Sequence, residues 1–342
     1  MSVSAEILEE RLKSGIRDIW YPVLPARFVT STPISIWRCG FRIVLWRDDE
    51  GKAHALEDRC PHRAAPLSQG VVMGDVIACP YHGVQVNAQG KTVSVPGSPG
   101  CKLEGMHATR AFPVEEKADA IFLFVGETKD TKPTPLRLPK ELEDPEYSSF
   151  LCYTEWNGDY RYVYDNVMDP MHGTFLHHHS HSMSEGESQA NFVIRETADG
   201  FVFEKDGQKG VNFDWTEFLD LDSHWMKLEI PYPATGGPGG CFMILGAYTP
   251  MQENWAGVFH WRLRKVSGWQ RDAWRFLYKN RLEGRHWHVL EQDRVLLEDM
   301  QPDAVKHEIL YQHDMGLVRL RRYFKQKAEK QLAALQGGSK AA

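Results

Sequence analysis

Three features that define large classes of protein are missing from this sequence: long apolar runs, an excess of positive charge, and a regular cysteine framework. No segment of the 342 residues approaches the roughly 18 consecutive apolar residues of a membrane-spanning helix, and the N-terminus lacks the apolar core of a signal peptide. The formal net charge of −6 argues against a nucleic-acid-binding protein, which needs a basic surface. Because the six cysteines are dispersed, we expect reduced thiols and a cytoplasmic location, without membrane contact.

Motifs for a nicotinamide site and for a plant-type ferredoxin are also missing. The sequence has no G-x-G-x-x-G fingerprint and no C-x4-C-x2-C run. The glycine-rich segment 236–240 is not followed by a helix that starts with Lys-Ser or Lys-Thr, so it predicts a turn rather than a phosphate-binding loop. Redox chemistry that starts from NAD(P)H would therefore need a separate reductase protein.

Two short loops of Cys and His are the strongest positive feature. Cys60-Pro-His62 and Cys79-Pro-Tyr-His82 each offer one thiolate and one imidazole. Such a set can hold zinc or an iron–sulfur cluster, but zinc sites usually group Cys with Cys and His with His. The mixed pairing suits a [2Fe-2S] centre with two sulfurs on one iron and two imidazoles on the other. It resembles the Rieske motif at all four ligand positions.

Short segments rich in β-branched and aromatic residues, with turn residues between them, surround these loops. They predict antiparallel strands between residues 34 and 125, one of them over 71–78, in a small barrel or sandwich with the two Cys/His loops at the tips of neighbouring hairpins. We expect an N-terminal helix within 1–18, a Rieske domain over 19–126 and a polar, proline-rich linker over 127–140. By resemblance, the Pro/Gly loop 96–101 covers the cluster.

The rest of the chain predicts a second domain over 141–336 and a disordered tail over 337–342. Six β segments between residues 191 and 264 fit one antiparallel sheet that wraps a pocket, and the segments after them are helical. The predicted fold class is therefore α+β, with an all-β domain first and a sheet flanked by helices second.

A second metal site is indicated by the pattern D-x3-D-x2-H-x4-H, which runs from Asp165 through Asp169 and His172 to His177. A non-haem Fe(II) site that activates O2 needs two imidazoles and one carboxylate on one face of the metal. Five residues correspond to about 140° around a helix, so a helix must end or distort between the two histidines, and Gly173 favours this. More histidines follow directly, and a solvated histidine-rich loop is the alternative interpretation.

The complete motif resembles that of the Rieske non-haem iron oxygenases, and the resemblance covers nearly the whole chain. It implies a helix-grip-like second domain in which His172 and His177 bind a mononuclear iron. It also implies that Asp169 bridges towards a Rieske histidine of a neighbouring subunit, and that an Asp of a C-terminal helix is the third iron ligand. Asp293 fits that position best. The weaker alternatives are Glu298 and Asp299.

The resemblance implies a homotrimer in which the Rieske cluster, with a potential of roughly −150 to +300 mV, passes electrons to the iron of the next subunit. The electrons would come from a reductase, with or without a ferredoxin, and O2 would react with an apolar, aromatic substrate. Ring hydroxylation in aromatic hydrocarbon catabolism is the expected activity, and oxidative O- or N-demethylation is the alternative. Two alternative functions outside the oxygenases are a Rieske electron carrier and a zinc-binding interaction module, but neither explains the second motif.

The substrate pocket should lie between the sheet and the last helices, lined with Phe, Met and Trp side chains. A substrate that carries a carboxylate would need an Arg or Lys there, and spacing alone selects none. The polar or flat residues that are candidates to orient the substrate are Asn212, His260, His286 and Trp287.

Overall fold

The computed structural model describes residues 3–179, 189–210, 213–232, 240–252, 254–301 and 303–338. The chain divides into two compact units. The smaller unit comprises residues 14–136 and 249–252, and the larger one comprises the remaining residues, including both termini. The division at residues 136 and 137 falls inside the segment that we expected to be a linker.

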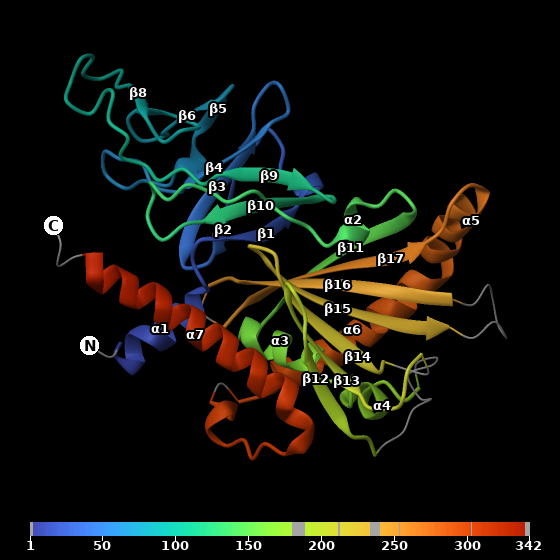
Figure 1. The fold of residues 1–342 in the computed structure, drawn as a ribbon. Helices are drawn as coiled ribbons and strands as arrows, with labels where there is room; N and C mark the ends of the chain where they lie inside the picture. The colour runs from blue at the N-terminus through green and yellow to red at the C-terminus, as the bar shows by residue number, and fades with distance from the viewer. Residues whose placement is uncertain are drawn as a thin grey trace. The chain divides into compact units, whose positions relative to one another are not determined.

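The smaller unit is built from antiparallel β-strands (Figure 1). Its sheets have the strand orders β1-β10-β9, β2-β3-β4 and β5-β6-β7-β8. The strands are β1 (Ile19–Pro25), β2 (Ile34–Arg38), β3 (Phe41–Arg47), β4 (Ala53–Glu57), β5 (Val71–Met73), β6 (Val76–Ala78), β7 (Gln85–Asn87), β8 (Thr92–Ser94), β9 (Val114–Lys117) and β10 (Ala120–Val125). The 3-10 helices are η1 (Ala26–Phe28) and η2 (Leu67–Gln69).

Two local predictions for this unit were wrong. Residues 71–78 form the hairpin β5–β6 rather than one strand, because Gly74 adopts the left-handed conformation (φ 63°) that a tight turn requires. The loop that contains Cys60 is not a hairpin tip either. It connects β4 of one sheet to β5 of another, and η2 lies within this connection. The loop that contains Cys79 does join the paired strands β6 and β7, as predicted.

The larger unit is organised around one sheet with the order β11-β17-β16-β15-β14-β13-β12. The strands are β11 (Tyr147–Trp156), β12 (Phe192–Glu196), β13 (Gly200–Lys205), β14 (Trp215–Asp220), β15 (His224–Tyr232), β16 (Gly240–Pro250) and β17 (Ala256–Lys265). The helices are α1 (Ala5–Ser14), α2 (Lys140–Glu143), α3 (Tyr160–Met168), α4 (His172–Leu176), α5 (Trp269–Leu277), the π-helical η5 (Tyr278–Leu282), α6 (Glu283–Glu298), η6 (Ala304–Lys306), η7 (Gln312–Asp314) and α7 (Met315–Gly338).

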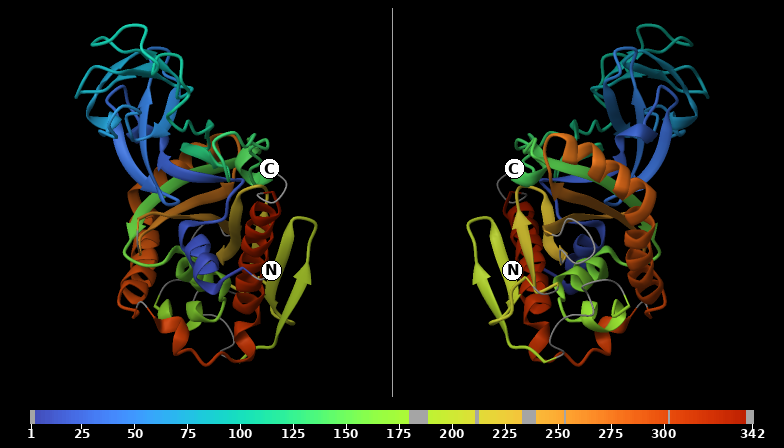
Figure 2. Two further views of the ribbon diagram at one scale, coloured as in Figure 1. Left: turned by 90° about the vertical axis from the view of Figure 1, so that its left-hand side faces the viewer. Right: turned by 90° about the vertical axis from the view of Figure 1, so that its right-hand side faces the viewer.

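Helices α3 and α7 pack on one face of this sheet (Figures 1 and 2). The ring of Tyr164 in α3 contacts Tyr248 of β16 and Phe324 of α7, and all three side chains are buried. Because side chains alternate along a strand, His260 and Arg262 of β17 share one face of the sheet, whereas Trp261 packs on the other. This alternation decides which residues reach the space between sheet and helices.

The α+β fold class is confirmed, with the all-β unit and the sheet-and-helix unit in the predicted chain order. Helix α7 continues through Gly337 and Gly338, which we expected to be disordered, and residues 339–342 lie outside the described part of the chain. Within that described part, no helix combines the length and the apolar character that crossing a bilayer requires.

Candidate metal centres and substrate pocket

The two Cys/His loops present two kinds of ligand in two environments. The Cys60 and Cys79 thiols are 2% and 3% exposed and belong to the core of the smaller unit, whereas His62 and His82 are exposed. The two imidazole rings meet edge to face with centroids 4.7 Å apart. Burial is the main reason that the pKa of Cys60 is raised, and the neighbouring Cys79 thiol raises it further. A positive iron pair would offset this unfavourable ionisation, so the four side chains fit a [2Fe-2S] cluster.

Both loops have the same backbone construction. The amide of Cys60 donates to the carbonyl of Ala65, and the amide of Ala64 donates back to the Cys60 carbonyl. The second loop repeats this pattern, with Cys79 bonded to Val84 and with Gly83 in the place of Ala64. The fourth residue after each cysteine is left-handed, with φ of 58° at Ala64 and 70° at Gly83. Each cysteine is therefore held by its own loop.

Contacts outside the two loops support them. The buried carboxylate of Asp58 accepts from the amide and the hydroxyl of Ser68, both at 2.7 Å, which fixes η2 after the first loop. Pro96 lies beside Gly83, since a Cβ on that glycine would be 3.4 Å from the proline Cγ. The loop 96–101 thus begins next to the second ligand loop. Its role as a cover for the cluster stays a prediction.

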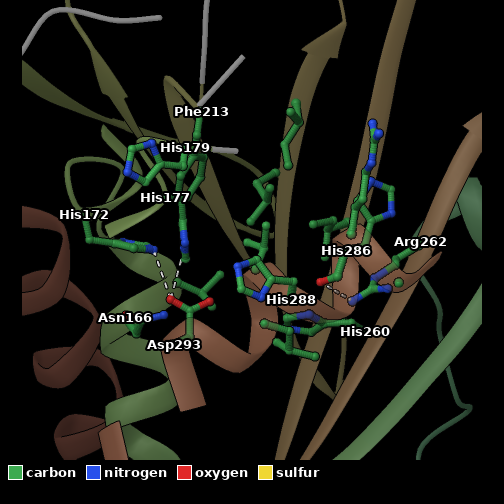
Figure 3. Close-up of a pocket in the computed structure, with 18 residues that line it drawn as sticks. Asn166, His172, His177, His179, Phe213, His260, Arg262, His286, His288 and Asp293 are labelled. Atoms are coloured by element: carbon green, nitrogen blue, oxygen red, sulfur yellow. Dashed lines mark hydrogen bonds and ion pairs between the residues drawn. The ribbon is translucent and has the colours of Figure 1, made fainter. Parts of the chain in front are cut away.

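In the larger unit, His172, His177 and Asp293 converge on one point (Figure 3). One ligand atom from each residue lies within 4.8 Å of the other two. The Oδ1 atom of Asp293 is 3.1 Å from Nε2 of His177 and 3.6 Å from Nε2 of His172, yet this buried oxygen makes no hydrogen bond of normal geometry among the described residues. An oxygen that faces two imidazole nitrogens without bonding to either fits a shared metal ion.

The other ring nitrogen of each histidine is oriented by a hydrogen bond. Nδ1 of His172 donates to the carbonyl of Asp169 at 2.6 Å, and Nδ1 of His177 donates to Oε1 of Gln292 at 3.0 Å. These bonds leave both Nε2 atoms as metal ligands. Helix α4 begins at His172 and ends before His177, so the expected break exists, but Gly173 lies inside the helix and does not cause it.

The charges at this site favour a bound cation. Burial raises the pKa of Asp293, but the nearby His177 and His172 outweigh burial, so its pKa is lowered. Burial lowers the pKa of His177, and Asp293 reverses this, so the net shift is upward. A carboxylate that stays ionised inside the protein beside two imidazoles is the donor set of a non-haem Fe(II) site. The residues therefore fit a mononuclear iron.

The other carboxylates proposed from the sequence lie elsewhere. Glu298 accepts from the Asn157 amide at 2.9 Å and pairs with Arg294, and Asp299 is exposed at the end of α6. Asp169 is half-exposed and accepts from the amide of Met171 at 2.7 Å. The Asp169 carboxylate does not belong to the convergent group of His172, His177 and Asp293. Asp169 supports that group through its backbone carbonyl, which accepts from Nδ1 of His172.

A cavity of about 460 Å³ adjoins the three convergent residues. His260 and His286 line it, as the sequence analysis proposed, but Trp287 does not, and Asn212 lies outside the described residues. The expected Met and Trp lining is wrong for the described part of the wall, because Trp225 and Trp261 pack on the opposite face of the sheet. The lining side chains are Asn166, Val167, His172, His177, His179, Phe213, Leu228, Ile230, Ile244, His260, Arg262, Arg285, His286, His288, Val289, Leu290 and Asp293.

Two histidines of the pocket wall differ in their role from the metal-site pair. Nε2 of His260 lies 2.9 Å from the Tyr248 hydroxyl, and burial, with help from Arg262, lowers the pKa of His260 to about 3. His260 is therefore a neutral hydrogen-bonding group. His286 lies one helical turn before Leu290, on the face of α6 that lines the cavity.

Sequence reasoning missed Asn166, Gln292 and Arg262. Asn166 lies inside the D-x3-D-x2-H-x4-H motif but at one of its variable positions, and it helps to lower the pKa of Asp293. Gln292 is adjacent to the predicted ligand Asp293, so the position was within reach of a helix-face argument. Nothing in the sequence around Arg262 distinguishes it from Arg264, the other arginine of β17.

Two Cys/His loops of Rieske type and a separate site of two histidines and one carboxylate define the class of a two-centre iron protein. A family model described as Rieske [2Fe-2S] domain matches residues 19–112, and one described as vanillate O-demethylase oxygenase C-terminal domain matches residues 156–330. The second match covers just over half of the chain. The chain belongs to this family of Rieske oxygenases.

Individual proteins agree with this assignment. The chain is 31% identical over 161 residues to the vanillate O-demethylase oxygenase subunit of a Pseudomonas species, covering 47% of this chain and 45% of that protein. It is 33% identical over 171 residues to the oxygenase component of chloroacetanilide N-alkylformylase of Rhizorhabdus wittichii, with 47% of each covered. The chain thus spans about half the length of these curated relatives.

A solved structure extends the likeness in fold to almost the whole chain. An oxygenase–ferredoxin complex of carbazole 1,9a-dioxygenase superposes with a TM-score of 0.76 over 96% of this chain and 95% of that one, at 18% identity. At this identity the comparison concerns the fold, and it confirms the arrangement of a Rieske domain followed by a sheet-and-helix domain.

Proposed function

We propose that this protein is the terminal oxygenase component of a multicomponent system. It uses O2 and electrons from NAD(P)H, relayed by a separate reductase, to oxidise an aromatic or similarly apolar substrate. The observation that carries the proposal is the convergence of His172, His177 and Asp293 at the wall of a largely apolar cavity, in a chain that also has a Rieske domain.

Iron held by these three residues would supply O2 activation beside the substrate. The chain supplies the orientation: Asp169 and Gln292 set the ring positions of His172 and His177. The aliphatic wall formed by Leu228, Ile230 and Ile244 excludes water from one side of the cavity. In the overall balance, one oxygen atom enters the substrate and the other leaves as water, which consumes two electrons and two protons.

The partners belong to this proposal. A reductase is required because the sequence has no nicotinamide motif, and the carbazole relative, which was solved with a ferredoxin, supports an iron–sulfur donor that docks on the protein. We also propose a homotrimer in the cytoplasm, in which the half-exposed carboxylate of Asp169 links the iron site to the exposed Rieske histidines of a neighbouring subunit. An Asp169→Asn variant should keep its iron and lose the fast oxidation of the reduced cluster by O2.

Ring hydroxylation and oxidative demethylation are both compatible with the site. The match to the vanillate O-demethylase oxygenase domain and the likeness to an N-alkylformylase component are consistent with the alternative, attack on a carbon attached to O or N, without ranking it above ring hydroxylation. The likeness in fold to a dioxygenase gives no preference. The two reactions differ in whether the pocket holds a ring edge or a methyl group next to the iron, and only demethylation of a methyl group releases formaldehyde.

The test begins with metal content. The full chain is purified without oxygen, loaded with iron and compared with His172→Ala by iron analysis and by visible and EPR spectroscopy. We expect about three irons per chain in the wild type and about two in the variant, with an unchanged Rieske signal, since the cluster itself holds two. O2 uptake, hydroxylated product and formaldehyde are then measured on aromatic and methoxylated compounds with a surrogate reductase. Two irons in both proteins would refute the oxygenase function and favour an electron carrier.

A further inference from the structure

Arg262 is a buried cation in the wall of the cavity. It projects from β17 on the same face as His260, and its side chain is 2% exposed. Figure 3 shows its guanidinium on the opposite side of the pocket from Asp293. The cavity therefore has the metal-binding carboxylate at one end and a fixed positive charge at the other.

The groups that hold Arg262 are neutral. Nη1 donates to the Tyr278 hydroxyl at 3.1 Å, and Nη2 donates to the backbone carbonyl of His286 at 3.1 Å. The guanidinium lies 5.3 Å from the centre of the Trp287 ring. Its Nε is buried and has no hydrogen-bond partner among the described residues, and none of their carboxylates forms an ion pair with it. The geometry of the guanidinium is fixed, while its charge is not compensated.

Neighbouring groups do not correct this imbalance. Asp293 is the sole carboxylate among the described residues of the cavity wall, and it faces the two histidines of the metal site. His260 is neutral and bonded to Tyr248. Burying a charge costs free energy unless a group of opposite charge pairs with it. The cavity should therefore bind an anion next to Arg262.

We propose that Arg262 is the counter-ion for a carboxylate on the substrate, and that the oxygenase acts on aromatic acids rather than on neutral hydrocarbons. The planar guanidinium matches a planar carboxylate, and its buried Nε has no acceptor among the described residues. With the acid group at Arg262, the apolar body of the substrate lies along Leu228 and Ile244 towards the metal site. This inference rests on the proposed function and specifies its substrate class.

The experiment uses two ligands of nearly equal shape, benzoate and benzamide. Their affinities for the iron-loaded, full-length wild type are measured by calorimetry without oxygen. We expect benzoate to bind at least about tenfold more tightly, because the amide cannot neutralise the guanidinium. Equal affinities, or no binding of benzoate, would overturn the proposal. This arm needs no variant and no turnover.

Variants then locate the anion. Arg262→Gln should bind benzamide as the wild type does and lose the preference for benzoate, whereas Arg262→Lys should retain part of it. The control is Arg264→Gln, which removes the same charge two residues away, where Arg264 packs over Trp274 outside the cavity wall. A benzoate preference that survives in Arg262→Gln would mean that the carboxylate binds the iron instead, and would also overturn the proposal.

One further variant separates charge from packing. Arg262 fixes α6 to the sheet, and Tyr278→Phe removes one of its hydrogen bonds while leaving the charge in place. The benzoate preference should persist in Tyr278→Phe. Its loss there, together with loss in Arg262→Gln, would show that both changes act by disturbing the helix. A failure of the benzoate test leaves the oxygenase function intact, while a missing third iron refutes that function without reference to these affinities.

Discussion

The two candidate metal centres of this protein are built in opposite ways. In the smaller unit, Cys60, His62, Cys79 and His82 lie within 23 residues, and each loop closes on itself through backbone hydrogen bonds. In the larger unit, the ligands come from α4, from His177 directly after it and from the distant helix α6, and the site exists only when α6 packs against α3 and the sheet. One site is local, and the other depends on the complete fold.

The ligands of the two centres also differ in their exposure to solvent. The smaller unit buries its thiols and presents its histidines at the surface, which suits a centre that exchanges electrons with another protein. In the larger unit His177 and Asp293 are 1% and 8% exposed, which suits a centre that must keep water away from its reaction. Independence of the two centres is the first consequence to test.

The largest effect is expected from Asp293→Ala. Removing the buried carboxylate should empty the mononuclear site and reduce turnover to below about 1% of wild type, since two histidines alone bind Fe(II) weakly. Iron analysis should show about one iron fewer per chain, and the Rieske EPR signal should not change. Asp299→Ala, at the exposed position directly after the same helix, is the matched control and should keep all its iron. A loss of the Rieske signal in Asp293→Ala would show that the two centres are not independent.

A smaller effect is expected from Gln292→Leu, which deletes the acceptor for Nδ1 of His177 but leaves all three ligands in place. Iron affinity should fall by about 10- to 100-fold, as is usual when the group that orients a histidine ligand is lost. Chelator competition measures this directly. Glu291→Ala removes a neighbouring exposed side chain that pairs with Arg294 and should not alter affinity. Equal affinities in all three proteins would mean that α4 alone orients His177.

Acid should destabilise the larger unit through buried neutral histidines. Burial, with the nearby Lys327, lowers the pKa of His224 to about 3, although Asp220 opposes the shift. Below about pH 6.5 the unfolded chain binds a proton here that the folded protein does not. Stability therefore falls with falling pH, by about 1.4 kcal/mol per pH unit for this residue. Urea titrations at pH 7 and pH 5 should show a weaker pH dependence in His224→Phe, whose ring still packs against Phe218. An unchanged dependence would contradict this account.

The smallest effects are expected from exchanging the left-handed residues of the two cluster loops. Gly83→Ala should destabilise the smaller unit by about 1 kcal/mol, because an L-residue at φ 70° is strained. Ala64→Gly relieves the equivalent strain and should have the opposite sign and a smaller size. The midpoint of thermal cluster loss, followed by visible absorption, reports both changes. Shifts of the same sign would show that the two loops are not equivalent.

The contrast between a local and a non-local site also explains which features could be predicted from the sequence. The Cys/His loops, the β14 to β17 strands and the two histidines of the D-x3-D-x2-H-x4-H motif were predictable, because each is specified by residues close together in the chain. Asp293 was selected by family resemblance rather than by any local signal. The β5–β6 hairpin and the connecting role of the first loop were mispredicted, since a single glycine and a change of sheet leave little trace in a hydrophobic pattern.

The sequence by itself determined the chemistry: which residue types could hold two kinds of iron centre, and that no nicotinamide motif accompanies them. Only the tertiary structure decided what surrounds that chemistry. Strand alternation turned Trp225 and Trp261 away from the cavity and turned His260 and Arg262 into it. The neutral partners of Arg262 come from η5 and α6, and the charge balance of a buried group depends on such distant neighbours rather than on adjacent residues.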